Sequence, residues 1–133
     1  MADTLSFALV SPAREEFSGE VDHVIAPGTE GEFGVLPNHA PFMTTLRNGV
    51  VRVLRNGQAD LRLFVRGGFA DVTAAGLTIL AEESVNLANV DSARVDAELQ
   101  ETREKLKSHS RDDGQYGMLE AHVRYLEDLR AAI

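Results

Sequence analysis

The sequence contains no cysteine, which excludes disulfides and thiolate metal sites and leaves no need for an oxidising compartment. No apolar run approaches the roughly 20 residues that a transmembrane helix needs. The first ten residues, MADTLSFALV, lack the basic and long apolar regions of a signal peptide, and the acidic Asp3 is atypical of a transit peptide. We therefore expect a soluble, cytoplasmic protein.

Positive charge is also scarce, because 13 Lys and Arg residues stand against 21 Asp and Glu residues, for a formal net charge of −8. Such a chain would repel the phosphates of nucleic acid, so we expect no nucleic-acid partner. The 44% of hydrophobic residues is ordinary for a globular protein. A length of 133 residues suits one domain, or one domain with a small appendage.

Catalytic and metal-binding patterns are missing as well. Serine, histidine and aspartate all occur, but no nucleophile elbow surrounds any serine. Asp22-His23 and His39 lack the spacing of paired metal ligands, so a surface contact or a core hydrogen bond explains them better. The sequence predicts no catalytic residue, no metal site and no cofactor.

The two parts of the chain differ in composition. Residues 1–88 are rich in β-branched, aromatic and glycine residues, whereas glycine is sparse and helix formers dominate in residues 89–133. In the first part, Asn56-Gly57 is the pair preferred at a two-residue hairpin turn. The alternation on either side of this turn places Arg52 and Arg62 toward water. Eight or more short strands at this spacing predict a β-sandwich or flattened barrel. The predicted strands are Leu5–Val10, Glu16–Ala26 with a bulge at Gly19, Val50–Arg55, Ala59–Arg66, Phe69–Thr73 and Leu77–Ala81, with short strands flanking the segment 26–46.

The segment 26–46, APGTEGEFGVLPNHAPFMTTL, combines closely spaced glycines with Pro37, His39 and Pro41. Glycine allows tight turns, and proline fixes φ and extends the residue before it. We predict a rigid loop between short strands that displays Glu30, Glu32 and His39 and suits recognition rather than chemistry. A phosphate-binding loop is the alternative, but the Lys-Ser/Thr pair is absent and the two carboxylates would repel an anion.

The second part predicts two helices. Asn89 or Asp91 can cap the first, which extends to about Lys107, and Val95, Leu99, Thr102 and Leu106 form one narrow apolar stripe. Ser108–Gly114 interrupts the pattern, and a second helix over about Gln115–Ala132 has its own stripe in Tyr116, Leu119, Val123, Leu126 and Ile133. Two such helices joined by a short loop predict an antiparallel hairpin.

These motifs resemble a known family. GEFGVLPNHAPFMTTL (31–46), GGFADV (67–72), LTILAE (77–82) and the FSGEV segment (17–21) are similar to the epsilon subunit of bacterial F-type ATP synthase, and the match spans essentially the whole chain. The resemblance implies a ten-stranded β-sandwich followed by an antiparallel helical hairpin. It implies a non-catalytic rotor subunit that binds the gamma subunit and the polar loops of the c-ring, at the cytoplasmic face of the bacterial inner membrane. Glu30, Glu32 and His39 fall on the loop that in the family faces the c-ring.

The resemblance also raises a weak ATP site on the hairpin. Some relatives bind ATP through an Ile/Leu-Asp-x-x-Arg-Ala motif and arginines on both helices; here Asp91 and Arg94 keep part of that motif, and Arg124 matches a second-helix arginine. The next expected arginine is Asp128, and Asp91 has a sufficient explanation as a helix cap. A triphosphate needs several convergent cations, so the sequence argues against physiological ATP binding.

Inhibition of ATP hydrolysis by the hairpin, through contacts with the catalytic subunits, is expected to be weak, because residues 89–133 carry seven Lys and Arg but ten Asp and Glu. The rival hypothesis is a free-standing β-sandwich binding module whose hairpin dimerises or senses a ligand. The two differ in the surface they predict, since a rotor subunit should expose an apolar patch for a partner.

Overall fold

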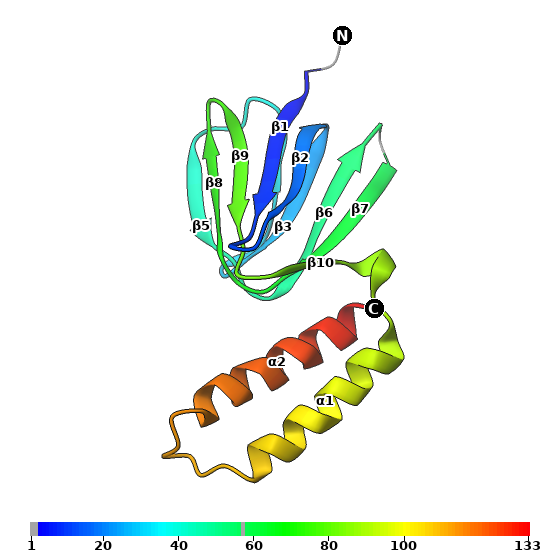
Figure 1. The fold of residues 1–133 in the computed structure, drawn as a ribbon. Coiled ribbons are helices and arrows are strands. Elements are labelled where there is room, and N and C mark those ends of the chain that lie inside the picture. The colour runs from blue at the N-terminus through cyan, green and yellow to red at the C-terminus, as the bar shows by residue number, and fades with distance from the viewer. Residues whose placement is uncertain (1–2, 57) are drawn as a thin grey trace. The chain divides into compact units, whose positions relative to one another are not determined.

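A computed structural model describes residues 3–56 and 58–133. Packing divides the chain into two compact units, Met1–Ala88 and Asn89–Ile133, here called the β unit and the helical unit. Among these described residues, the β unit contains ten strands in two five-stranded sheets, and the helical unit contains two helices (Figure 1). The prediction of a β-sandwich followed by a helical hairpin is confirmed.

Sheet A has the strand order β2-β1-β9-β8-β5. Its strands are β1 (Leu5–Val10), β2 (Glu15–Val21), β5 (Phe42–Thr45), β8 (Phe69–Thr73) and β9 (Gly76–Leu80). All neighbours are antiparallel except β1 and β9, which pair in parallel. The strands predicted at Phe69–Thr73 and Leu77–Ala81 pair as the β8–β9 hairpin, which turns at Ala74-Ala75.

Sheet B has the order β10-β7-β6-β3-β4. Its strands are β3 (His23–Gly28), β4 (Gly31–Val35), β6 (Gly49–Arg55), β7 (Gln58–Val65) and β10 (Ser84–Asn86). The β6–β7 hairpin forms as predicted, and Asn56 has the positive φ of 56° that its turn requires. Gly57, the other predicted turn residue, lies outside the described residues.

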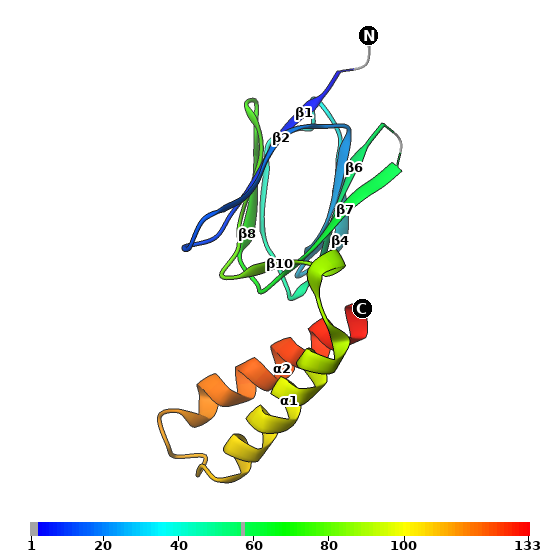
Figure 2. The same ribbon diagram turned by 45° about the vertical axis from the view of Figure 1, so that its right-hand side comes forward.

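The two sheets face each other across one apolar core (Figure 2). Because strand side chains alternate between faces, every second residue of the central strands points inward. The inward-facing residues include Leu5, Phe7, Leu9, Val21, Val24, Val35, Val51, Val53, Leu63, Val65, Val72, Leu77 and Ile79.

The predicted strand Glu16–Ala26 is wrong as a single element. The structure divides it into β2, in sheet A, and β3, in sheet B, and the chain changes sheets at Asp22. The backbone N–H of Asp22 donates to Leu54 O at 3.0 Å, which fixes this corner. Gly19 pairs regularly with Phe7, and the irregularity lies nearer the other end of the pair, between Leu9 and Val10. The eleven residues 16–26 contain no proline, so the local sequence did not indicate that the chain crosses from one sheet to the other here.

The helical unit follows a short 3₁₀ turn, η1 (Leu87–Asn89). Helix α1 spans Ser92–Lys107, and Asp91 is its N-cap, with a side-chain oxygen that accepts from the N–H of Ala93 at 2.9 Å. Helix α2 spans Tyr116–Ala132. The α1 stripe is confirmed, since Val95, Leu99 and Thr102 are buried and Leu106 is half-buried. On α2 the buried residues are Tyr125, Leu126 and Leu129. The predicted stripe is correct at Leu126, half-buried at Tyr116, Leu119 and Val123, and wrong at Ile133, which is exposed.

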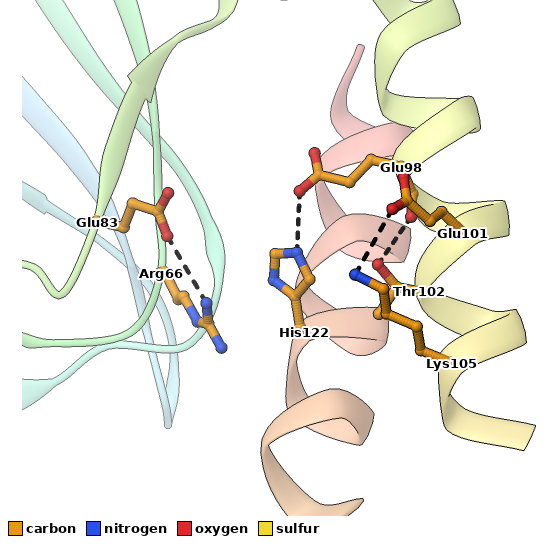
Figure 3. Close-up of polar contacts among 7 residues, drawn as sticks. All are labelled: Arg66, Glu83, Glu98, Glu101, Thr102, Lys105 and His122. Carbon is orange, nitrogen blue, oxygen red and sulfur yellow. Dashed lines mark hydrogen bonds and ion pairs between the residues drawn. The ribbon is translucent and has the colours of Figure 1, made fainter. Parts of the chain in front are cut away.

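Polar contacts fasten the two helices. Arg130 Nε donates to Asp96 Oδ1 at 2.8 Å, Arg103 Nη2 donates to Glu127 Oε2 at 2.9 Å, and His122 Nε2 lies 3.1 Å from Glu98 Oε1. Figure 3 shows the last of these, together with the buried Thr102 hydroxyl that donates to the Glu98 carbonyl at 2.8 Å. Within α1, Glu101 and Lys105 lie one turn apart and form an ion pair, with 3.5 Å between Oε1 and Nζ. These contacts fix an antiparallel register.

Candidate subunit-contact surface

The loop predicted for recognition is built from two turns with β4 between them. The first turn, Thr29–Glu30, joins β3 to β4, and Gly31 follows it with a φ of +133°, which a side chain rarely adopts. Glu30 is exposed at this turn. Glu32 is exposed on β4, where its Oε1 accepts from Arg52 Nη2 at 3.1 Å. Both carboxylates are therefore available to solvent on a fixed backbone.

The second turn, 36–41, joins β4 to β5 and holds His39. Asn38 adopts a φ of 64°, and the N–H of His39 donates to Leu36 O at 3.2 Å. Nδ1 of His39 lies 2.6 Å from the Ala40 carbonyl, which can only accept, so Nδ1 carries the hydrogen. The ring of His39 lies 6.1 Å from that of Phe42. His39 also lines a cleft of about 480 Å³ together with Thr4, Glu20, Asn38 and Thr73.

The structure does not bring the three predicted contact residues into one cluster. Glu30 precedes β4 and His39 follows it, so they lie at opposite ends of a five-residue strand, which is about 16 Å long. Glu32 lies between them on the strand. Together they border one edge of the sandwich rather than a single point, because β4 is the edge strand of sheet B.

Exposed apolar side chains flank this edge, and sequence reasoning did not identify them. Leu36 is 56% exposed, Phe42 41% and Met43 65%. The ring of Phe42 packs edge-on against that of Phe33, with 5.3 Å between the ring centroids. This contact links β5, the edge strand of sheet A, to β4, the edge strand of sheet B. β4 and β5 are edge strands, and an edge strand has no neighbouring strand on one side to cover it.

The residues of the candidate ATP site lie on the helical unit. Asp91 caps α1 and Arg94 is exposed in the first turn, whereas Arg124 is exposed on α2. The Asp96–Arg130 pair places the start of α1 level with the end of α2. Arg124 precedes Arg130 by nearly two turns, so it lies about 10 Å from Arg94 along the hairpin axis. The geometry separates these cations, and the absence of physiological ATP binding here stays a prediction.

The described residues were also compared with the requirements of a metal site and of a membrane-spanning helix. Within the described residues no group of three or more Asp, Glu and His side chains could hold a metal ion. Neither helix in the described part of the chain is long and apolar enough to cross a membrane.

Similarity to known proteins now decides the family. The protein-family model for the ATP synthase delta/epsilon chain, β-sandwich domain, matches residues 4–87 of this chain. The chain belongs to the ATP synthase delta/epsilon family. The ATP synthase epsilon chain of Hyphomonas neptunium is 61% identical over 133 residues, which are 100% of this chain and 98% of that one. By this membership the epsilon-type chain is a non-catalytic component of the central stalk of F-type ATP synthase, a complex that carries out ATP synthesis and proton transport.

Two further comparisons differ in how much of this chain they cover. The epsilon chain of Caulobacter vibrioides is 62% identical over 84 residues, which are 63% of this chain but 96% of that one. That relative is therefore about as long as the β unit alone. A chain in the structure of Euglena gracilis mitochondrial ATP synthase, OSCP/F1/c-ring, matches 97% of this chain and 81% of its own length, with 27% identity and a TM-score of 0.78.

Proposed function

We propose that this epsilon-type subunit links a gamma subunit to the c-ring and so couples proton translocation to ATP synthesis. One observation carries the proposal: the β unit presents exposed apolar side chains beside rigidly held polar ones, at the edge formed by β4 and β5. A free-standing module would be polar all round apart from a ligand cleft, whereas a subunit between two partners needs such a surface. The subunit would then be peripheral, at the cytoplasmic face of the bacterial inner membrane, and held there through the complex.

In this proposal the β4 edge and the following turn contact the polar loops of the c-ring. Glu30, Glu32 and His39 offer two carboxylates and an imidazole whose Nδ1 is already engaged by Ala40, so Nε2 is left for a partner. The backbone that carries them is fixed by the β3–β4 pairing and by the turn at Asn38. A surface that is already ordered loses little entropy when it binds.

The test is co-purification from gently solubilised membranes with a tagged chain that carries Glu32→Lys and His39→Ala. We expect c-ring recovery to fall about tenfold, because the variant loses an imidazole and reverses a charge at the contact. The matched control, Glu101→Lys with His109→Ala, makes the same chemical changes on the helical unit and should leave c-ring recovery unchanged. Full c-ring recovery with the first variant would overturn the loop assignment. If the wild-type chain recovers neither gamma nor c-ring while the ATPase complex survives, the linking role is wrong.

The helical unit has a minor role in this proposal. Its net charge is negative, and Arg103 and Arg130, two of its cations, are occupied by Glu127 and Asp96 in the closed hairpin. Lys105 and Lys107 are paired as well, with Glu101 and Glu104, so few cations remain for the acidic loops of catalytic subunits. The relative from Caulobacter vibrioides, about as long as the β unit, supports the view that the hairpin is an accessory.

Deletion of residues 89–133 should therefore change ATP hydrolysis by the assembled complex less than about twofold, since surface charges of this kind contribute little. The measurement is the hydrolysis rate of purified complexes with the full-length and the shortened chain, at equal occupancy of the subunit. A several-fold activation on deletion would show that the hairpin inhibits and would sink this prediction.

A further inference from the structure

We infer that Asp3 and Asn38 are positioning residues for the turn that carries His39 (residues 36–41, here called the contact turn). The inference rests on the proposed contact of this turn with the c-ring. Asn38 Nδ2 donates to Asp3 Oδ2 at 2.9 Å, across 35 positions of the sequence. An ionised carboxylate only accepts, so the NH₂ group of the asparagine faces it, and the charge strengthens the bond. The start of the chain thus restrains the residue directly before His39.

The bonded residue is also the one whose backbone is least ordinary. Asn38 has a φ of 64°, in the left-handed region that most side chains avoid and asparagine tolerates. Asparagine in a turn commonly bonds the backbone nearby, but here its amide reaches Asp3. Within the turn, the N–H of His39 donates to Leu36 O at 3.2 Å, at the long end of the usual range. The bond to Asp3 therefore adds a restraint from outside the turn.

The N-terminal segment, residues 3 and 4, is itself anchored. Leu5 is the first residue of β1 and is 4% exposed in the core, and Thr4 Oγ1 donates to Glu20 Oε1 at 2.7 Å. Chain termini are poorly ordered unless they are tied down in this way. Because Asp3 is two residues from a buried position, little conformational freedom is lost when it bonds Asn38. The segment can therefore hold the turn in place.

The Asp3–Asn38 bond joins two walls of the cleft that His39 lines. Residues 4–6, 38–41 and 72–76 surround this cleft of about 480 Å³. Parallel pairing of β1 with β9 places residues 4–6 beside the β8–β9 turn, and Figure 1 shows both at the same end of the β unit. The contact turn belongs to the connection from β4 to β5. The bond thus ties this connection to the start of β1.

Two restraints then act on the imidazole in series. The hydrogen bond from Nδ1 to the Ala40 carbonyl, at 2.6 Å, orients the ring of His39 within the contact turn. The bond from Asn38 to Asp3 orients the turn on the sandwich. Without the second bond, the imidazole would sample more positions, and ordering it would cost entropy when a partner binds. Asp3 acts through this restraint and does not itself need to touch the partner.

Exchanging the two side chains tests the inference. Asn38→Asp keeps the shape of the side chain and its tolerance of a positive φ, but it places a second carboxylate against Asp3. Asp3→Asn with Asn38→Asp exchanges donor and acceptor and should restore the bond. The readout is c-ring recovery from gently solubilised membranes, with a C-terminal tag that leaves the N-terminal segment unaltered. We expect recovery to fall about fivefold with Asn38→Asp and to return to within about twofold of wild type with the exchange, as suits one hydrogen bond.

Two controls separate the bond from backbone and charge effects. Asn38→Gly keeps access to a positive φ but removes the amide, so recovery should fall and Asp3→Asn should not restore it. Asp112→Asn makes the same charge change as Asp3→Asn in the segment between the two helices and should leave recovery unchanged. Restoration by Asp3→Asn in the Asn38→Asp background alone would show that the two side chains act as a pair.

NMR relaxation of the free, full-length chain gives a readout that does not need the c-ring. The backbone amides of residues 38–40 should lose order in Asn38→Asp and regain it in the exchanged variant, whereas the amides of α1 should not change. Unchanged order of the turn in Asn38→Asp, or no restoration by the exchange, would overturn the inference. Loss of order in the free chain with full c-ring recovery would instead refute the proposed contact of this turn with the c-ring.

Discussion

Replacing Gly68 by alanine should unfold or severely destabilise the β unit. The φ of Gly68 is +107°, and an added Cβ would lie 2.0 Å from Leu80 O and 2.8 Å from Ala81 Cα. Both obstacles are backbone atoms at the end of β9, so no side chain can rotate away. Left-handed strain and overpacking each contribute about 1–3 kcal/mol, so we expect a loss of about 3 kcal/mol or more. Urea denaturation followed by circular dichroism measures it.

Two other glycines separate the causes of this loss. Gly31 has a φ of +133° with nothing within 4 Å of an added Cβ, so Gly31→Ala reports the backbone strain without a clash. Gly19 does not adopt a positive φ, and its Cβ would meet Phe17 at an ordinary 3.7 Å, so Gly19→Ala should be close to neutral. The expected order of destabilisation is Gly68, Gly31 and Gly19. If Gly68→Ala is no worse than Gly31→Ala, sheet A yields at that point and the steric argument fails.

Replacing Phe7 by alanine is the second large effect. Phe7 is 1% exposed in the middle of β1, and its ring lies 5.5 Å from that of Phe17. Removing a buried phenylalanine side chain leaves a cavity and costs about 3–5 kcal/mol. A domain of this size has a total stability of about 5–15 kcal/mol, so the variant would be marginal. The free energy of unfolding from urea titration checks this.

Phe69→Ala is the matched comparison, because it removes the same side chain from the same sheet at a site that is 38% exposed. We expect it to cost less than about 1.5 kcal/mol, since much of its surface is already in water. Equal losses for Phe7 and Phe69 would show that Phe69 supports the core, and the argument from burial would fail.

The packing of the β unit suits a part that joins two partners. The turn that holds His39 follows β4, and the N-terminal segment bonded to it leads into β1; both strands place residues in the apolar core. Torque passed between two partners would cross a β-sandwich whose core is closely packed. Close-packed interiors have low compressibility, so such a unit transmits strain with little loss.

Much of the architecture was predictable because its signals are local. The β6–β7 and β8–β9 hairpins follow from turn chemistry at Asn56 and Gly76, and the start of α1 follows from the capping ability of Asp91. The stripe of Val95, Leu99 and Thr102 follows from helical periodicity. Each of these features depends on residues within a few positions of one another.

The wrong predictions also have a common cause, because each depends on contacts between residues that are far apart in the sequence. The division of the predicted strand Glu16–Ala26 depends on the hydrogen bond from the Asp22 N–H to Leu54 O, and no residue next to Asp22 in the sequence indicates this bond. The burial of Tyr125 and Leu129 in place of Ile133 depends on how α2 packs. Glu30 and His39 lie on turns as predicted, but Glu32 lies on the edge strand β4 and not on a loop, and the sequence could not show that β4 holds Glu30 and His39 apart.

By itself the sequence determined the fold class, most elements and the resemblance to the epsilon family, because composition, turn residues and periodicity act locally. The tertiary structure alone decided the parallel pairing of β1 with β9. That pairing brings residues 4–6 beside the β8–β9 turn, and with it forms the cleft that His39 lines. Residues seventy positions apart become neighbours only when the whole sandwich closes, since strand register is set by the packing of the entire sheet and not by any single strand.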